Sequence, residues 1–161
     1  MAQLKLFQVY CIDANSLINL KRVYPRSMKV FSPIWEKIEG MIKMDLLVSH
    51  FEVYREIKEG NDEISKWATI NRKIFKEPDD QEQIRNFEKV KEQYDTDYWE
   101  RETNADRPWG DPWIIALSMA IKATIVTDEN KEKGNRIPSV ARQFQIASLN
   151  LLEFFKEIGI E

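Results

Sequence analysis

The sequence predicts an α/β protein, a three-layer α/β/α sandwich around a mainly parallel central sheet of four to five strands. Short apolar runs alternate with amphipathic helical patterns along the 161 residues. These runs are continuous rather than alternating, which is typical of strands buried on both faces of a parallel sheet. Two of the runs end at acidic residues, Asp13 and Asp128, as expected where a chain leaves the carboxyl edge of such a sheet.

The composition predicts a soluble, cytoplasmic protein of one domain, residues 1–161. Hydrophobic residues make up 43% and charged residues 32% of the chain. No apolar run reaches the roughly 20 residues that span a bilayer, and the N-terminus lacks the pattern of a signal peptide. The net charge of −3 argues against non-specific nucleic-acid binding over the whole surface, but it leaves room for a local basic rim.

Several kinds of chemistry are excluded by what the sequence lacks. Cys11 is the only cysteine and His50 the only histidine, so disulfides and Cys/His zinc sites are absent. His50 lacks the Gly-x-Ser-x-Gly elbow that often accompanies a serine triad, and the five glycines form no phosphate-binding loop. The groups that remain available for chemistry are carboxylates, amides, hydroxyls or a bound metal.

The first half of the chain predicts two strands with helices after each. A strand over residues 6–12 leads to a helix over 16–24, bounded by Pro25. Ser32-Pro33 opens an amphipathic helix, and residues 46–48 form an apolar strand.

A helix over residues 51–58 carries acids on one face, which in most helices is a solvated face. Ser49 and Glu52 have the spacing of a capping box, so Glu52 is assigned a structural role. Glu56 has no such local role and lies beside apolar residues. Glu56 is therefore the acid of this helix chosen for chemistry.

The middle of the chain, residues 60–107, predicts a helical insertion or lid within the same domain. An amphipathic helix over 63–75 is broken around Pro78, and a long charged helix over 84–99 follows.

The last third predicts three helices and two more strands. Asp111-Pro112 opens the most apolar helix, over 113–123, and Asp111 is expected to be its N-cap while still projecting where a metal could share it. Asp106, in the preceding loop, is a weaker candidate. The other expected elements are a strand over 124–127, a short helix over 140–144, a strand over 146–149 and a helix over 151–158.

The carboxylates at these boundaries are expected to meet at one edge of the sheet. Asp13, Glu56, Asp111 and either Asp128 or Glu129 offer oxygen ligands without imidazole or thiolate, which suits Mg²⁺ or Mn²⁺. Such a site activates water and stabilises the charge that develops on a phosphodiester.

Four blocks of the sequence resemble the PIN domain family, in the order found in that family and over nearly the whole chain. They are residues 13–18, Ser49 with Glu56-Ile57, residues 110–117 and residues 125–129. The resemblance implies a Mg²⁺- or Mn²⁺-dependent endoribonuclease, often the toxin of a toxin–antitoxin pair. The charged segment 60–107 departs from the family's pattern and leaves the shape of the substrate groove undetermined. The acidic composition is a further departure from that pattern.

By position, the resemblance makes Asp13, Glu56 and Asp111 the three core acids and Asn15 a supporting polar residue. The fourth acid is open between Asp128, which is shorter, and Glu129, which has the family's spacing. The residues expected to bind RNA are the basic side chains of Lys131, Lys133, Arg136 and Arg107, with Trp109 as the stacking ring.

Two other functions compete with the ribonuclease. One is a catalytically silent PIN-like protein that binds protein or RNA. The other is a phosphatase with Asp13 as nucleophile, which Asn15 disfavours because such enzymes commonly carry a second Asp there. An antitoxin could cover Trp35, Trp67 and Trp99, although burial in the core is an equal expectation, and a homodimer is also expected as a possible assembly.

Overall fold

A computed structural model describes residues 8–60 and 62–160, and its centre is a parallel five-stranded sheet. The strands lie in the order β3-β2-β1-β4-β5, and every pair is parallel. Their bounds are β1 Tyr10–Ile12, β2 Leu47–His50, β3 Phe75–Lys76, β4 Thr124–Val126 and β5 Ser148–Leu149. The predicted α/β class with a parallel sheet is confirmed.

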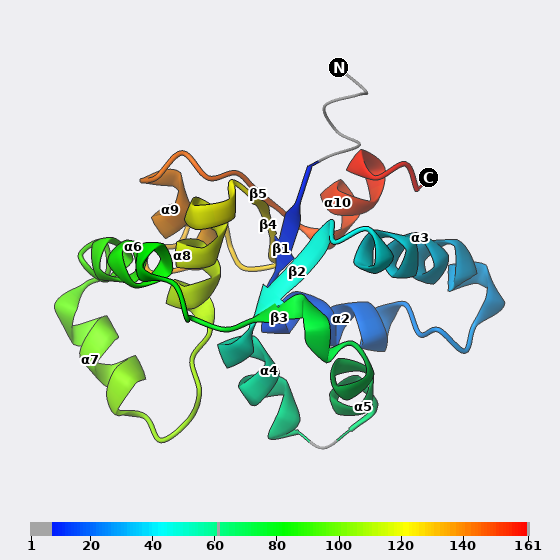
Figure 1. Ribbon diagram of the computed structural model, residues 1–161, viewed down its shortest axis with the longest axis horizontal. Coiled ribbons are helices and arrows are strands. Elements are labelled where there is room, and N and C mark those ends of the chain that lie inside the picture. The colour runs from blue at the N-terminus through cyan, green and yellow to red at the C-terminus, as the bar shows by residue number, and fades with distance from the viewer. Residues whose placement is uncertain (1–7, 61, 161) are drawn as a thin grey trace.

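Helices cover both faces of the sheet, which makes three layers (Figure 1). Helices α6, α8 and α9 lie on one side and α2, α3 and α10 on the other, while α4 and α5 pack against α2. The helices are α2 Ala14–Val23, α3 Ser32–Lys43, α4 Phe51–Lys58, α5 Glu63–Ile70, α6 Gln81–Lys91, α7 Thr96–Asn104, α8 Asp111–Ile121, α9 Ile137–Arg142 and α10 Leu151–Glu157, with 3₁₀ turns at Lys29–Phe31 and Arg72–Ile74.

The core explains why the strands are continuous apolar runs. All three residues of β1 are buried, and α8 is buried along most of its length between the sheet and α6. A strand or helix covered on every side has no solvent face to mark with polar residues. The expected strand over 6–12 is shorter here: Val9 lies outside β1, and Leu6 and Phe7 lie outside the described residues.

The order of the strands places a topological switch point between β1 and β4. The chain moves from β1 to β2 and β3 in one direction, and then crosses to β4 and β5 on the other side of β1. At such a point the connections leave the sheet in opposite directions and open a crevice beyond the carboxyl ends of the strands. Asp13 follows β1 directly, and Asp128-Glu129 lie shortly after β4.

The middle of the chain differs from its prediction. The expected helix over 63–75 ends at Ile70, and Phe75–Lys76 forms β3, an edge strand that pairs with β2. The expected long helix over 84–99 is two helices, α6 and α7, separated by a turn. Both differences arise from tertiary partners that local periodicity does not encode: β2 for the strand, and the loop after β4 for the turn.

Two predicted helix caps are wrong. The Ser49 hydroxyl donates to the Ile12 carbonyl over 2.6 Å, and the Glu52 N–H that it was expected to cap bonds to Nδ1 of His50 instead. The N-cap of α8 is Gly110, so Asp111 is the first helical residue rather than the cap.

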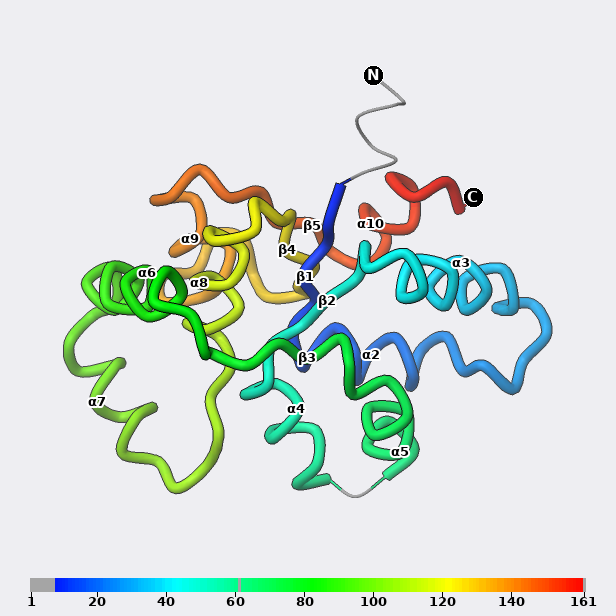
Figure 2. Tube along the Cα trace, in the orientation of Figure 1, coloured from blue at the N-terminus to red at the C-terminus, as the bar shows by residue number. Residues whose placement is uncertain are grey.

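The start of β1 and the end of α10 lie close together at the amino end of the sheet (Figure 2). The Tyr10 hydroxyl joins them by donating to Glu157 over 2.7 Å.

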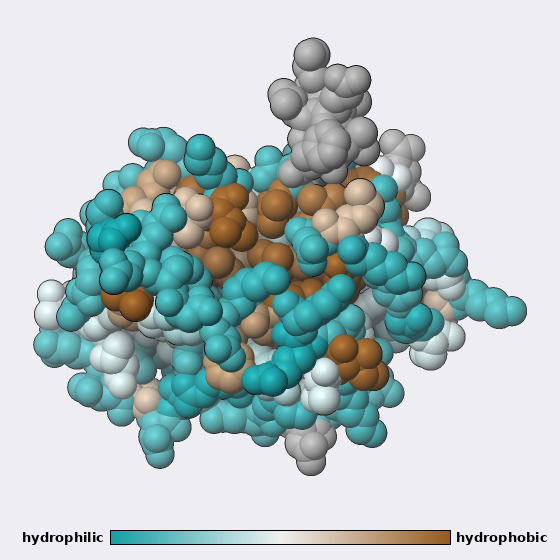
Figure 3. Space-filling model, viewed as in Figure 1, coloured by the Kyte–Doolittle hydropathy of each residue, from teal (hydrophilic) through white to brown (hydrophobic). Residues whose placement is uncertain are grey.

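On the face drawn in Figure 3, hydrophobic residues gather near the centre and hydrophilic ones dominate elsewhere. Within the described ranges, no helix is both long and apolar enough to cross a membrane.

Candidate active site

Asp13 lies at the end of β1 and is almost completely buried, with 2% of its surface exposed. Its Oδ1 accepts the Ser16 N–H over 2.8 Å and so caps α2, and its Oδ2 accepts the Thr127 hydroxyl over 2.6 Å. Burial raises the pKa of Asp13 to about 6; these hydrogen bonds act to lower it and the nearby Glu129 carboxylate to raise it. Hydrogen bonds to both of its oxygens therefore hold this acid at the switch point.

Glu56 reaches the same region from the second turn of α4, where its Oε1 accepts the N–H of Gly110. A Cβ at Gly110 would lie 2.8 Å from Val53 Cγ2 and 3.0 Å from Glu56 Oε1, so only glycine allows this approach. Burial raises the pKa of Glu56 to about 7, and the Gly110 hydrogen bond opposes that shift. The Asp13 carboxylate raises this pKa as well, which places the two acids in one electrostatic cluster.

Asp111 is the first residue of α8 and belongs to the same cluster. The pKa of Asp111 is raised well above the usual range, mainly because the carboxyl is buried. The neighbouring carboxylates of Glu129, Asp13 and Glu56 raise this pKa further. A hydrogen bond with the Trp109 side chain opposes the shift. A helix N-terminus ordinarily favours a carboxylate, so burial and three neighbouring acids here outweigh that preference.

The structure separates the two candidates for the fourth acid. Glu129 is half-buried, accepts the Ile137 N–H over 3.0 Å and raises the pKa of both Asp13 and Asp111. Asp128 is exposed and uses its two oxygens elsewhere, to accept from Asn19 over 3.0 Å and from the Leu151 N–H over 2.9 Å. Of the two candidates for the fourth acid, Glu129 therefore lies with the other acids, and Asp128, also a candidate metal ligand, does not. We call Asp13, Glu56, Asp111 and Glu129 the acid cluster.

A cavity of about 310 Å³ opens beside the acid cluster. Two arginines line it: Arg107 is paired with Glu102 over 2.7 Å, and Arg136 donates to the Tyr98 hydroxyl over 2.7 Å. The full lining is Glu56, Glu59, Tyr98, Glu102, Arg107, Pro108, Trp109, Asp111 and Arg136. The cavity thus brings two of the acids together with three of the predicted substrate residues, Arg107, Trp109 and Arg136.

Other predicted substrate residues lie apart from this cavity. Lys131 is bonded to Glu153 over 2.5 Å, and Lys133 is exposed in the loop after β4. Asn15 is exposed on the first turn of α2. None of these three side chains lines the cavity.

The tryptophans are mainly structural. Trp35, Trp67 and Trp99 are buried in the core, which decides between the two expectations in favour of burial and against a surface for an antitoxin. Trp113, on the first turn of α8, stacks on the His50 and Phe87 rings at 5.0 and 4.1 Å between centroids.

Sequence reasoning missed several residues that shape the site. Thr127 enters the sequence pattern only through its spacing to an acid, yet its hydroxyl holds Asp13. Gly110 enters only as the start of a motif, yet it makes room for Glu56. Tyr98 has no recognisable signal, because only the fold brings α7 to the cavity.

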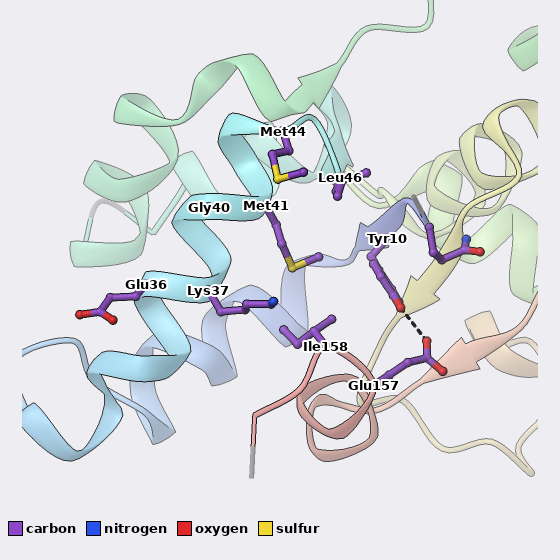
Figure 4. A pocket seen from close by; sticks show the side chains of 10 residues that line it. Tyr10, Glu36, Lys37, Gly40, Met41, Met44, Leu46, Glu157 and Ile158 are labelled. Carbon is purple, nitrogen blue, oxygen red and sulfur yellow. Dashed lines mark hydrogen bonds between the residues drawn. The ribbon is translucent and has the colours of Figure 1, made fainter. Parts of the chain in front are cut away.

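A second hollow, of about 240 Å³, lies at the amino end of the sheet and differs in chemistry (Figure 4). Met41, Met44 and Ile158 supply apolar lining, and the Tyr10–Glu157 hydrogen bond crosses one wall. Its position and its apolar walls separate it from the acid cluster.

In the residues that the structure describes, no group of three or more His, Cys, Asp or Glu side chains converges closely enough to hold a metal ion. The acid cluster is defined by mutual electrostatic effects, since its members raise one another's pKa.

Fold and site together define a doubly wound α/β protein with clustered acids at its switch point. The chain belongs to the family described as a domain of unknown function, DUF4411, which matches residues 10–161. No curated protein matches the chain.

Proposed function

We propose that this protein is a Mg²⁺- or Mn²⁺-dependent endoribonuclease of the PIN type. One observation carries the proposal: four acids from four segments of the chain gather at the switch point, and the pKa of each is raised. Holding like charges together in a buried place is unfavourable unless a cation compensates for it. Raised pKa values of this kind are common at functional sites.

The residues fit a divalent cation by donor type and by charge. All four side chains offer oxygen, the ligand atom preferred by Mg²⁺ and Mn²⁺. Asp13, Glu56, Asp111 and Glu129 would hold the ion. When bound, the ion would supply Lewis acidity and lower the pKa of water beside an RNA phosphate.

The surrounding residues hold these acids and provide room for the substrate. Thr127 and the Ser16 N–H fix both oxygens of Asp13, and the Gly110 N–H fixes Glu56. Arg107 and Arg136, in the adjoining cavity, carry the positive charge that a phosphodiester requires. The cavity thus supports RNA binding directly beside the acids.

The resemblance to PIN domains extends the proposal to a cytoplasmic toxin with a cognate antitoxin, and to a homodimer as a possible assembly. The buried tryptophans remove one reason for an antitoxin surface, so this part of the proposal rests on the resemblance alone. Co-purification of the natively expressed protein tests it: a stoichiometric small partner supports the toxin, whereas a chain that purifies alone contradicts it.

Cleavage of an RNA pool tests the ribonuclease. Single-stranded and structured RNAs are incubated with Mn²⁺, Mg²⁺ or EDTA and with wild type, Asp13→Asn or Asp45→Asn. Asp45 is an exposed acid between α3 and β2 whose φ of 57° suits asparagine equally well, so this control removes one charge without changing the fold.

We expect cleavage by wild type and Asp45→Asn with either metal, and none with EDTA or with Asp13→Asn. Metal-independent cleavage, or unchanged cleavage by Asp13→Asn, would contradict the proposal. If Mn²⁺ neither supports cleavage nor stabilises the protein, the silent binding protein becomes the better hypothesis.

A further inference from the structure

Tyr94 lies in the turn between α6 and α7, and its hydroxyl is buried without a partner. Only 6% of the residue is exposed, and within the described part of the chain its hydroxyl makes no hydrogen bond. The ring packs edge-on against Trp109 at 5.4 Å and stacks on Tyr98 at 6.0 Å between centroids. Trp109 and Tyr98 both line the cavity beside the acid cluster. A buried hydroxyl that bonds to nothing is unfavourable and needs an explanation.

The turn that carries Tyr94 is fixed to the loop that carries Glu129 and Arg136. Asn135 of this loop accepts the Asp95 N–H over 2.9 Å and donates to the Asp95 carboxylate over 2.8 Å. Asn135 has a φ of 62°, which asparagine tolerates better than most residues. This double hydrogen bond involves the residue next to Tyr94, and it holds the turn that carries Tyr94 against the loop that carries Glu129.

The acids of the cluster also influence the pKa of the Tyr94 hydroxyl. Burial is the main cause that raises the pKa of Tyr94, and the Asp111 and Glu129 carboxylates raise it further, while Arg136 opposes them. The phenol therefore keeps its proton beside two acids of the cluster. A neutral hydroxyl is a hydrogen-bond donor that a bound anion could use.

We propose that the Tyr94 hydroxyl is a substrate-binding group of the active site, which donates a hydrogen bond to a phosphate oxygen of the RNA held at the acid cluster. This inference rests on the proposed ribonuclease function. It makes the α6–α7 segment, residues 81–104, a part of the active site rather than only a cover over it. In the free protein the donor is buried and unsatisfied. Tyr94 does not itself line the cavity, so the Tyr98 and Trp109 rings that pack on it must shift before the substrate satisfies it.

The change Tyr94→Phe removes only the hydroxyl, and Tyr10→Phe is the matched control. The Tyr10 hydroxyl already has a partner, Glu157, at the opposite end of the sheet (Figure 4). The melting temperature in EDTA and the kcat/KM for single-stranded RNA with Mn²⁺ are measured for wild type and both variants.

We expect Tyr94→Phe to melt at or above the wild-type temperature and to lose about ten- to a hundredfold in kcat/KM, the range for a hydrogen bond to a charged group. Tyr10→Phe should show the reverse, a lower melting temperature and unchanged cleavage. A merely structural Tyr94 hydroxyl would lower the melting temperature on its removal.

Two results would overturn the inference while leaving the ribonuclease intact: wild-type cleavage by Tyr94→Phe, or a fall in its melting temperature like that of Tyr10→Phe. A wild type that fails to cleave any RNA would instead overturn the ribonuclease, and with it the role of Tyr94 as a donor to RNA.

Discussion

The Thr127 hydroxyl donates to the Asp13 carboxylate over 2.6 Å and joins two residues that are 114 positions apart. The same oxygen accepts the Glu129 N–H over 3.2 Å. One threonine therefore connects the acid after β1 with the acid after β4. This connection crosses the switch point, where the sheet brings the two strand ends side by side.

Thr127→Val should weaken both the fold and the site. The change keeps the shape but leaves a buried carboxylate with one hydrogen bond fewer, which costs about 1–3 kcal/mol of unfolding free energy. Urea unfolding at pH 7.5 measures this loss, and RNA cleavage should fall with it. Thr127→Ser, which keeps the hydroxyl, should retain most of both properties; equal stability of the valine variant would contradict the assignment.

The two adjacent acids after β4 should differ sharply on substitution. Glu129→Gln should abolish cleavage and stabilisation by Mn²⁺, because Glu129 belongs to the acid cluster. Asp128→Asn should keep cleavage and lose at most about 1 kcal/mol of stability, since asparagine also caps a helix start. Cleavage assays and thermal melts of both variants test which of the two acids belongs to the acid cluster. If only Asp128→Asn lost cleavage, Asp128 and not Glu129 would be the fourth acid.

Asp111→Asn should stabilise the protein in EDTA. The substitution removes a carboxyl whose ionisation is disfavoured by burial and by the neighbouring Glu129, Asp13 and Glu56. A gain of about 1 kcal/mol corresponds to a rise of roughly 2–4 °C in melting temperature for a chain of this size. Mn²⁺ should then stabilise wild type but not the variant. A lower melting temperature for Asp111→Asn in EDTA would argue that the acids do not repel one another.

Gly110→Ala should displace Glu56. The new Cβ would meet Val53 Cγ2 at 2.8 Å and Glu56 Oε1 at 3.0 Å, so α4 and the start of α8 must move apart. We expect a loss of about 1–3 kcal/mol in stability, the usual range for overpacking, together with lower cleavage. Gly134→Ala is the control, because a Cβ at Gly134 would have no neighbour within 4 Å among the described residues, and it should leave both properties unchanged.

His50 should make stability fall in acid. Its Nδ1 accepts the Glu52 N–H, so the neutral ring carries its proton on Nε2, facing Gln83 Oε1 at 3.2 Å. Burial lowers the pKa of His50 from 6.5 to about 4. Between pH 6.5 and 4 the unfolded chain therefore binds a proton at His50 more readily than the folded chain does. The contribution of neutral His50 to the free energy of unfolding is fully present above pH 6.5 and is lost as the pH falls to about 4.

The loss should amount to about 3 kcal/mol, at roughly 1.4 kcal/mol per pKa unit. The acid cluster acts in the opposite direction, since raised carboxyl pKa values favour the folded state at low pH. Urea unfolding from pH 4 to 8 for wild type and His50→Asn isolates the histidine, because asparagine caps the helix without titrating. Parallel profiles for the two proteins would contradict the neutral, buried assignment.

Much of this architecture could be predicted from local patterns. The helix predicted over residues 51–58 is α4 with the same bounds, and the apolar runs before Asp13 and Asp128 contain β1 and β4. These elements are readable because burial on every side demands continuous apolar residues, and because helix periodicity acts within a few turns. The acids Asp13, Glu56 and Asp111 could be found because each one stands at or near the end of such an element.

The sequence by itself determined the α/β class and most of the acids, because both follow from neighbours along the chain. Only the tertiary structure decided that Glu129 and not Asp128 faces the other acids, that Thr127 holds Asp13, and that Tyr94 packs against Trp109. Each of these is a contact between segments that are distant in sequence. A side chain two residues past a strand can point to either side, and what fixes its direction is the hydrogen-bond partner that the folded chain brings to it.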